Sequence, residues 1–150
     1  MMLSPASLEG RCNCFAVRKA ARYLGAAYDK ALAPAGLRNT QFSILQKLAS
    51  IGPVTIKQLA AIIAMDRTTL ATNLKPLERE GLVATTVAED RRARNIEITA
   101  HGRARFEEAL PHWSGVQDAF ERRFGEREAA ALRHSLQDVL ETGFEPWANP

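Results

Sequence analysis

Residues 55–99 read TIKQLAAIIAMDRTTLATNLKPLEREGLVATTVAEDRRARNIEIT, and this stretch decides the fold. Thr55, with Gln58 three residues later, has the pattern of a capping box, in which each side chain satisfies a free backbone N–H at the start of a helix. A short helix is therefore predicted from residue 56 to about residue 63. After a tight turn, Asp66 is a good N-cap for a second helix, which Gly81 ends. The apolar spacing predicts that the two helices bury Ile56, Leu59, Ile63, Leu70, Leu74 and Leu77.

A hairpin with an arginine-rich tip follows the second helix. Residues 82–87 and 95–99 are rich in β-branched side chains and partly alternating, and the polar segment AEDRRAR separates them. The sequence therefore predicts a two-stranded wing behind a helix-turn-helix. In a winged helix-turn-helix, one helix enters the major groove of DNA while the loop of the wing reaches toward the minor groove.

The outward face of the second helix carries short polar side chains. If Leu70 points inward, a rotation of about 100° per residue places Thr72 and Lys75 near the opposite side. Short hydroxyl and amide groups allow close approach to base edges, and cations neutralise phosphates. An ordinary solvated face is the alternative, but such a face usually carries more Glu and Lys and fewer threonines.

The arginines at the tip of the hairpin suit the negative potential of a narrow minor groove. Asp90 beside them is expected to orient Arg92, and a solvated loop with a weak ion pair is the alternative. Together the helix and the hairpin give a set of candidate DNA-binding residues: Arg67, Thr68, Thr69, Thr72, Asn73, Lys75, Arg79, Arg91, Arg92 and Arg94.

Amphipathic helices flank this region on both sides. They are predicted at residues 15–33, from Asn39 or Thr40 to residue 51, from a cap at Thr99 to about residue 124, and at residues 126–142. The fold class is therefore mainly α (α+β), a winged helix-turn-helix with additional N- and C-terminal helices. These terminal helices carry more apolar surface than a small winged core needs, which favours a homodimer; filling of the monomer's own core is the alternative.

The length and the charge distribution fit one DNA-binding domain. The chain has 150 residues and a net charge of +3, and it is expected to form a single domain over residues 1–150. Residues 1–105 sum to +8, whereas residues 106–150 sum to −5. This asymmetry suits a part that faces a polyanion joined to a part that contacts protein or solvent.

The cysteines and the hydropathy point to a cytoplasmic protein. Cys12 and Cys14 are the only cysteines, and one intervening residue makes a mutual disulfide awkward in regular structure. No secretory signal pattern and no membrane-spanning run are evident. A metal site would need these cysteines with His101, His112 or His134, but the spacing matches no recognised ligand pattern, so neither metal nor cofactor is expected.

Several short motifs, in this order, resemble those of the MarR family of bacterial transcription regulators. They are Gly52-Pro53-x-Thr55-Ile56 with Leu59-Ala60, Met65-Asp66-Arg67-Thr68-Thr69-Leu70, Leu77-Glu78-x-x-Gly81-Leu82-Val83, Asp90-x-Arg92 and Ile98-Thr99-x-x-Gly102. The resemblance spans nearly the whole chain. It implies a homodimer joined through residues 1–37 and 106–150, with residues 38–105 forming the DNA-binding region, that reads a palindromic operator, usually as a repressor.

The resemblance also suggests two kinds of signal. Family members commonly release DNA when a small aromatic ligand enters a cleft beside the dimerisation helices, or when a cysteine is oxidised. Cys14 resembles the sensing cysteine of the organic-hydroperoxide-responsive branch, where nearby tyrosines hold the thiolate; Tyr23 and Tyr28 are the tyrosines available here. A reactive thiol would need a lowered pKa, and a buried or incidental cysteine pair is the alternative. The candidate ligand or redox residues are Cys14, Tyr28, His112 and Trp113.

Other classes of protein are less well supported by the sequence. The chain has no nucleophile elbow, phosphate-binding loop, HExxH motif or dinucleotide fingerprint, so we do not expect an enzyme. A winged-helix module that binds only proteins remains an alternative. It predicts that Thr72, Lys75 and Arg92 are dispensable for DNA retention, whereas a regulator predicts an affinity that falls steeply with salt.

Overall fold

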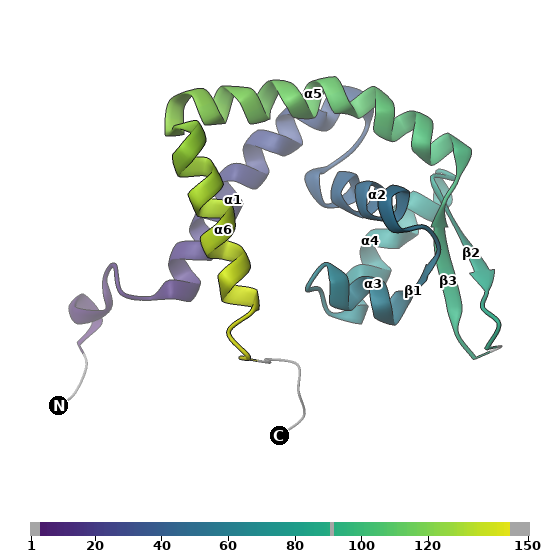
Figure 1. Ribbon diagram of the computed structural model, residues 1–150, viewed down its shortest axis with the longest axis horizontal. Coiled ribbons are helices and arrows are strands. Elements are labelled where there is room, and N and C mark those ends of the chain that lie inside the picture. Colours follow the sequence, from purple (N-terminus) through teal and green to yellow (C-terminus); the bar gives the residue numbers. More distant parts are fainter. Residues whose placement is uncertain (1–3, 91, 145–150) are drawn as a thin grey trace. The chain divides into compact units, whose positions relative to one another are not determined.

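The computed structural model describes residues 4–90 and 92–144, and most of these are helical (Figure 1). The chain divides after Trp113 into two compact units, and each is described by itself. The organisation into a single domain stays a prediction. The elements, in chain order, are η1 (Pro5–Leu8), α1 (Asn13–Leu32), η2 (Ala33–Ala35), α2 (Asn39–Ile51), β1 (Val54–Thr55), α3 (Ile56–Ile62), α4 (Arg67–Arg79), β2 (Val83–Val87), β3 (Arg94–Ile98), α5 (Ala100–Phe124) and α6 (Glu126–Leu140).

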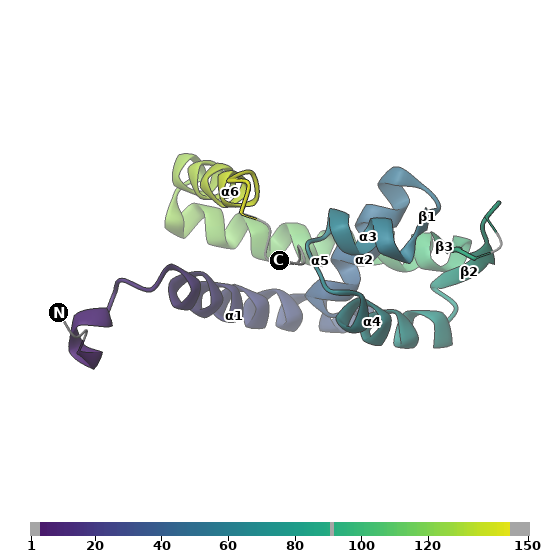
Figure 2. The ribbon, with the colours of Figure 1, turned by 90° about the horizontal axis from the view of Figure 1, so that it is seen from below.

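The first unit contains the predicted helix-turn-helix, α3 and α4, packed with α2 and a small sheet. Figure 2 shows α4 along one edge of this group. The leucines predicted to face inward are buried, and Ile56 and Ile63 pack against them. Because the predicted apolar stripe of each helix lies in this shared core, the core fixes which faces of α3 and α4 point outward. The largest fully buried side chains are Leu32, Ile44, Leu45, Leu48, Leu59, Leu70, Leu74, Leu77, Leu82 and Ile96.

The sheet has three antiparallel strands in the order β1-β3-β2, one more than the two-stranded wing predicted. Strands β2 and β3 form the predicted hairpin, with Thr85 opposite Ile96. The additional strand, β1, pairs Val54 with Ile96 and Thr55 with Asn95. Two residues are too few to show the alternation that marks a strand in sequence, which explains why β1 was missed.

One hydroxyl group ties the end of α4 to the start of α5. Thr99 Oγ1 accepts from the N–H of Gly102 at 3.0 Å, which confirms the predicted cap, and it donates to the carbonyl of Gly81 at 2.6 Å. The N–H of Thr99 also donates to the carbonyl of Leu82 at 3.1 Å. The wing therefore leaves α4 and enters α5 through a junction whose backbone groups are paired.

The start of α2 differs from the prediction that Asn39 or Thr40 caps it. Arg38 occupies the N-cap position, and its N–H donates to Gln41 Oε1 at 3.0 Å. Asn39 is the first residue of the helix, and its side chain contacts α1 instead. Residues 37–39 follow a turn at Gly36, which has a φ of 71°, so the chain changes direction between α1 and α2.

The second unit holds the end of α5 and all of α6. Arg133 of α6 donates to Glu121 of α5 at 2.8 Å, and Ala129 is buried. Much of the apolar stripe of α6 is exposed, including Leu136, Val139 and Leu140. Among the residues that the structure describes, no helix is long and apolar enough to cross a membrane.

Candidate nucleic-acid interface

The side chain of Asp66 fixes the start of the reading helix, α4. Its Oδ1 accepts from the N–H of Thr69 at 2.9 Å, and its Oδ2 accepts from the Thr69 hydroxyl at 2.6 Å. These bonds, the one from the hydroxyl first, lower the pKa of the Asp66 carboxyl below its ordinary value. Because the charged carboxylate is the form that accepts them, the cap is strongest when Asp66 is ionised.

Acid is expected to weaken this cap selectively. A carboxyl whose pKa is lowered by folding stabilises the protein above its ordinary pKa, and this contribution is lost as the pH falls through the folded value. We expect Asp66→Asn, which still caps a helix, to remove that part of the loss of stability that occurs below about pH 4. Urea unfolding of both proteins at about pH 7 and about pH 3 measures the difference. An equal acid sensitivity of the two would contradict the assignment.

The predicted reading face of α4 points into solvent. Arg67, Thr68, Thr69, Thr72, Lys75 and Arg79 are exposed, and Asn73 is half-buried. Two of the polar groups on this face bond to their own helix: the Thr72 hydroxyl donates to the Thr68 carbonyl at 3.0 Å, and Asn73 Nδ2 donates to the Thr69 carbonyl at 2.9 Å. These short side chains therefore lie against their own helix, which leaves the helix free to approach a groove closely.

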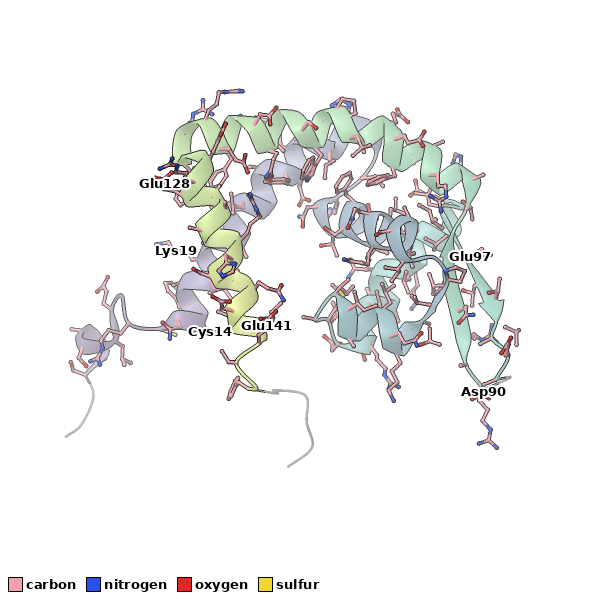
Figure 3. The ribbon with its side chains drawn as sticks, in the orientation of Figure 1. Cys14, Lys19, Asp90, Glu97, Glu128 and Glu141 are labelled. Carbon is pink, nitrogen blue, oxygen red and sulfur yellow. The ribbon has the colours of Figure 1, made fainter. Side chains whose placement is uncertain are left out.

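The wing extends from the same group of elements. Arg92 and Arg94 are exposed, whereas Arg91 lies outside the described residues. Figure 3 shows Asp90 at the tip of the hairpin. Asp90 Oδ1 accepts from the backbone N–H of Arg92 at 3.1 Å, so the carboxylate shapes the turn that carries Arg92.

A hydrogen bond between α4 and β2 was not predicted from the sequence. The Thr85 hydroxyl donates to Glu78 Oε1 at 3.0 Å. It joins the reading helix to the wing at an exposed position. Neither residue carries a sequence signal for this bond, because the pairing depends on how β2 returns along α4.

An aromatic pocket lies on the first unit between α1, α2 and the beginning of α5. The rings of Phe42 and Trp113 are stacked with centroids 6.1 Å apart, and Phe106 lies 5.0 Å from Phe42 on a tilted plane. On the α1 side the pocket has a volume of about 240 Å³, and a second hollow of about 300 Å³ shares Phe42, Ser43 and Trp113. The lining on the α1 side is Ala21, Leu24, Gly25, Tyr28, Leu32, Asn39, Phe42, Ser43 and Trp113.

The structure brings together only part of the predicted ligand or redox set. Tyr28 and Trp113 share the pocket, and His112 is half-buried beside Trp113 in the chain. Cys14 lies at the opposite end of α1 (Figure 3). Fourteen residues of helix at about 1.5 Å each separate it from Tyr28 by about 21 Å. The resemblance to the ligand-sensing and the oxidant-sensing branches therefore points to two separate places.

Both cysteines are free and exposed. Cys12 is the N-cap of α1, and its sulfur accepts from the N–H of Phe15 at 3.4 Å. Tyr23, the nearest tyrosine along α1, is 77% exposed and lies nine residues beyond Cys14, about 13 Å away along the helix axis. Tyr23 and Tyr28 are the two tyrosines of the chain, and neither therefore reaches the thiol of Cys14 within one molecule.

A capped helix with an outward polar face, an arginine-bearing hairpin beside it and a shared core define a winged helix-turn-helix of the DNA-binding type. Comparison with known proteins identifies the family of this chain. The MarR family model matches residues 37–93. The chain belongs to the MarR family and is a DNA-binding transcriptional regulator; this is a family of regulators and not of enzymes.

Three relatives illustrate the similarity. The M. tuberculosis transcriptional regulator MosR, solved in complex with DNA, is 42% identical with a TM-score of 0.72, and the match covers 86% of this chain and 98% of that one. CouR from Rhodococcus jostii RHA1, solved with bound p-coumaroyl-CoA, is 25% identical with a TM-score of 0.72, over 90% of this chain and 96% of that one. The HTH-type transcriptional regulator YwoH of Bacillus subtilis is 25% identical over 125 residues, which are 83% of this chain and 91% of that protein.

Proposed function

We propose that this protein is a homodimeric repressor that binds a palindromic operator and releases it when a small aromatic ligand enters the pocket beside Trp113. The stack of Phe42 and Trp113 carries the ligand part of this proposal, because flat aromatic walls recognise flat aromatic molecules. Each hollow lies at or below the lower end of the roughly 300–1,000 Å³ that drug-sized ligands occupy, so a single-ring compound suits it. The aromatic acyl ligand of CouR supports the same class.

Exposed apolar side chains support the dimer. Leu136, Val139 and Leu140, which share one face of α6, are 41%, 57% and 64% exposed, and Val17 of α1 is 46% exposed. Helices with a continuous unburied apolar stripe usually pack against a partner. A second copy of the same chain is the simplest partner, and a twofold axis would place two reading helices about 34–36 Å apart on consecutive turns of DNA.

DNA contact by the predicted residues is supported by the exposure of Thr72, Lys75 and Arg92 on one reading helix and its wing. In this assignment, Thr72 and its neighbours Thr68, Thr69 and Asn73 meet base edges, and Arg67, Lys75 and Arg79 meet phosphates. Arg91, Arg92 and Arg94 of the wing meet the minor groove. A module that binds only proteins would not need this arrangement of cations.

The test begins with selection of duplexes from a random DNA pool, which is expected to yield an inverted repeat. Lys75→Ala is then expected to weaken binding of that duplex by about tenfold to a hundredfold, and to lower the salt slope by about two, because a dimer loses one phosphate contact in each half. Arg127→Ala, an exposed cation on α6, is the matched control and should leave affinity unchanged. Equal effects of the two substitutions would contradict the assignment of α4.

The ligand part is tested by adding 4-hydroxybenzaldehyde or 4-hydroxycinnamate to the complex and following release of DNA by anisotropy. Binding in the pocket is expected to quench the fluorescence of Trp113, which is read with Trp147 replaced by Phe. Release without a change in this fluorescence would place the ligand elsewhere.

A second candidate signal is oxidation of Cys14. The observation that favours it is the exposure of the free thiol at the start of α1. Peroxide is then expected to release DNA from the parent protein and not from Cys14→Ser. Release from both proteins would remove this candidate.

A further inference from the structure

A carboxylate of α1 holds the first turn of α2. Asp29 Oδ1 accepts from the backbone N–H of Asn39 at 2.7 Å and from Asn39 Nδ2 at 2.7 Å. The same Nδ2 donates to the carbonyl of Gly25 at 3.5 Å. We call this arrangement, formed by Gly25, Asp29 and Asn39, the clasp.

The clasp supplies an acceptor for a backbone N–H at the start of α2, which the N-cap residue of that helix cannot supply. The first N–H groups of a helix have no partner inside the helix, and a carboxylate beside them is also favoured by the helix dipole. The N-cap residue of α2 is Arg38, whose side chain has no acceptor. Asp29 supplies that acceptor from another helix, ten residues earlier in the chain, so the start of α2 depends on its contact with α1.

The clasp also lies between the aromatic pocket and the reading helix. Gly25 and Asn39 line the pocket on its α1 side. Helix α2 contacts α1, and it also contacts both α4 and β3. A shift of the first turn of α2 therefore reaches the elements that carry the reading helix and the wing.

We propose that the clasp is the joint through which the pocket controls DNA binding. This role of the clasp rests on the proposed function, which supplies the identity of the natural occupant. An occupant that reaches Asn39 accepts a hydrogen bond from its Nδ2 in place of Asp29 or the carbonyl of Gly25. The contact between α2 and α1 is then weakened, and the affinity for DNA falls. Asp29 and Asn39 are thus positioning residues.

The geometry indicates what kind of group would act on the clasp. The bond from Asn39 Nδ2 to the carbonyl of Gly25 is long, at 3.5 Å, and is therefore the weakest of the three. A hydrogen-bond acceptor on an aromatic ring, such as a carbonyl or phenol oxygen, can replace it. A Cβ atom added at Gly25 would lie 3.5 Å from Asn39 Nδ2, in van der Waals contact, so a longer side chain at this position would begin beside the same amide.

This last contact allows a test that needs no ligand. Gly25→Met places a flexible side chain in the pocket beside Asn39 and imitates the bulk of an occupant, but not its hydrogen-bond acceptor. We expect it to weaken binding of the selected duplex by about tenfold, and Asp29→Ala to do the same, since coupling between sites is typically about 5- to 150-fold. The double variant should lose no more than either single variant, because both open one joint.

Three further variants separate coupling from simple loss of stability. Lys30→Ala, next to Asp29 and exposed, is the control and should bind DNA like the parent. Asp29→Asn keeps the shape of the side chain without its charge and should lose less than Asp29→Ala. The exchange of both residues, Asp29→Asn with Asn39→Asp, restores a bond between the two side chains and should recover most of the affinity.

Hydrogen exchange at residues 39–42 supplies the readout that a general structural defect would not give. Exchange there should accelerate in Gly25→Met and in Asp29→Ala and slow again in the exchanged pair, while the amides of α4 remain protected. Parent-like DNA affinity in Gly25→Met, or additive losses in the double variant, would overturn the proposal. If the clasp variants behave as expected but no aromatic compound releases DNA, the proposed class of ligand is wrong, and the role of the clasp in DNA binding is retained.

Discussion

Replacing Leu136 and Leu140 by glutamate is expected to turn the protein into a monomer and to weaken its DNA binding by about a hundredfold or more. The two side chains are 41% and 64% exposed in the single chain, so charging them should cost the fold of one protomer little. In a proposed dimer interface the same charges would be buried without partners. The loss of affinity follows because two linked half-sites bind about 10²- to 10⁴-fold better than one.

Sedimentation equilibrium measures the first effect and fluorescence anisotropy with the selected duplex the second. The matched control is Ala131→Glu with His134→Glu, which puts two acidic residues on the opposite face of α6, at a rotation of about 100° per residue. This control should remain dimeric. A dimeric Leu136→Glu/Leu140→Glu protein would exclude α6 from the interface.

Replacing Gly102 by alanine is expected to lower the free energy of unfolding by about 3 kcal/mol, at the upper end of the range for overpacking. A Cβ atom at this position would collide with the carbonyl oxygen of Leu82 and would lie 2.8 Å from Ile98 Cγ1. The carbonyl cannot easily retreat, because it accepts from the N–H of Thr99 at 3.1 Å. The junction between the wing and α5 therefore has room only for glycine.

Gly115 provides a control in the same helix. Outside the backbone of its own helix, no atom of the described residues lies within 4 Å of a Cβ atom added there. Gly115→Ala should therefore stabilise the protein by about 0.5–1 kcal/mol, because a glycine inside a helix is unfavourable. Urea unfolding at one protein concentration compares the two variants. A Gly102→Ala protein as stable as its parent would show that the junction can open without cost.

The winged module could be predicted almost completely from the sequence because its signals are local. The capping box of Thr55 and Gln58 is present, with bonds of 3.0 and 3.1 Å, and Asp66 caps α4 as expected. Each of these patterns lies within four residues. The short strand β1 and the bond between Thr85 and Glu78 were missed because they depend on segments that meet only after folding.

The pocket, too, was predicted only in part, because its contacts join segments that are distant in the sequence. The candidate set predicted from the sequence contained Tyr28 and Trp113 but not Phe42, which stacks on Trp113. The bond between Asp29 and Asn39 has no sequence signal, since the pattern around Asn39 predicts an N-cap of its own helix and not a contact with another helix. Partners that lie ten or more residues apart, across a turn, are fixed by packing and not by spacing.

Several hydrogen-bond donors of the reading helix are already engaged inside the protein. The hydroxyl hydrogens of Thr69 and Thr72 go to Asp66 and to the Thr68 carbonyl, and Asn73 gives one amide hydrogen to the Thr69 carbonyl. What remains for a duplex at these positions is mainly methyl groups and oxygen lone pairs. Adenine and cytosine each offer an amino hydrogen in the major groove, but only thymine adds a methyl group, so in the proposed complex with DNA we expect A·T pairs opposite these positions.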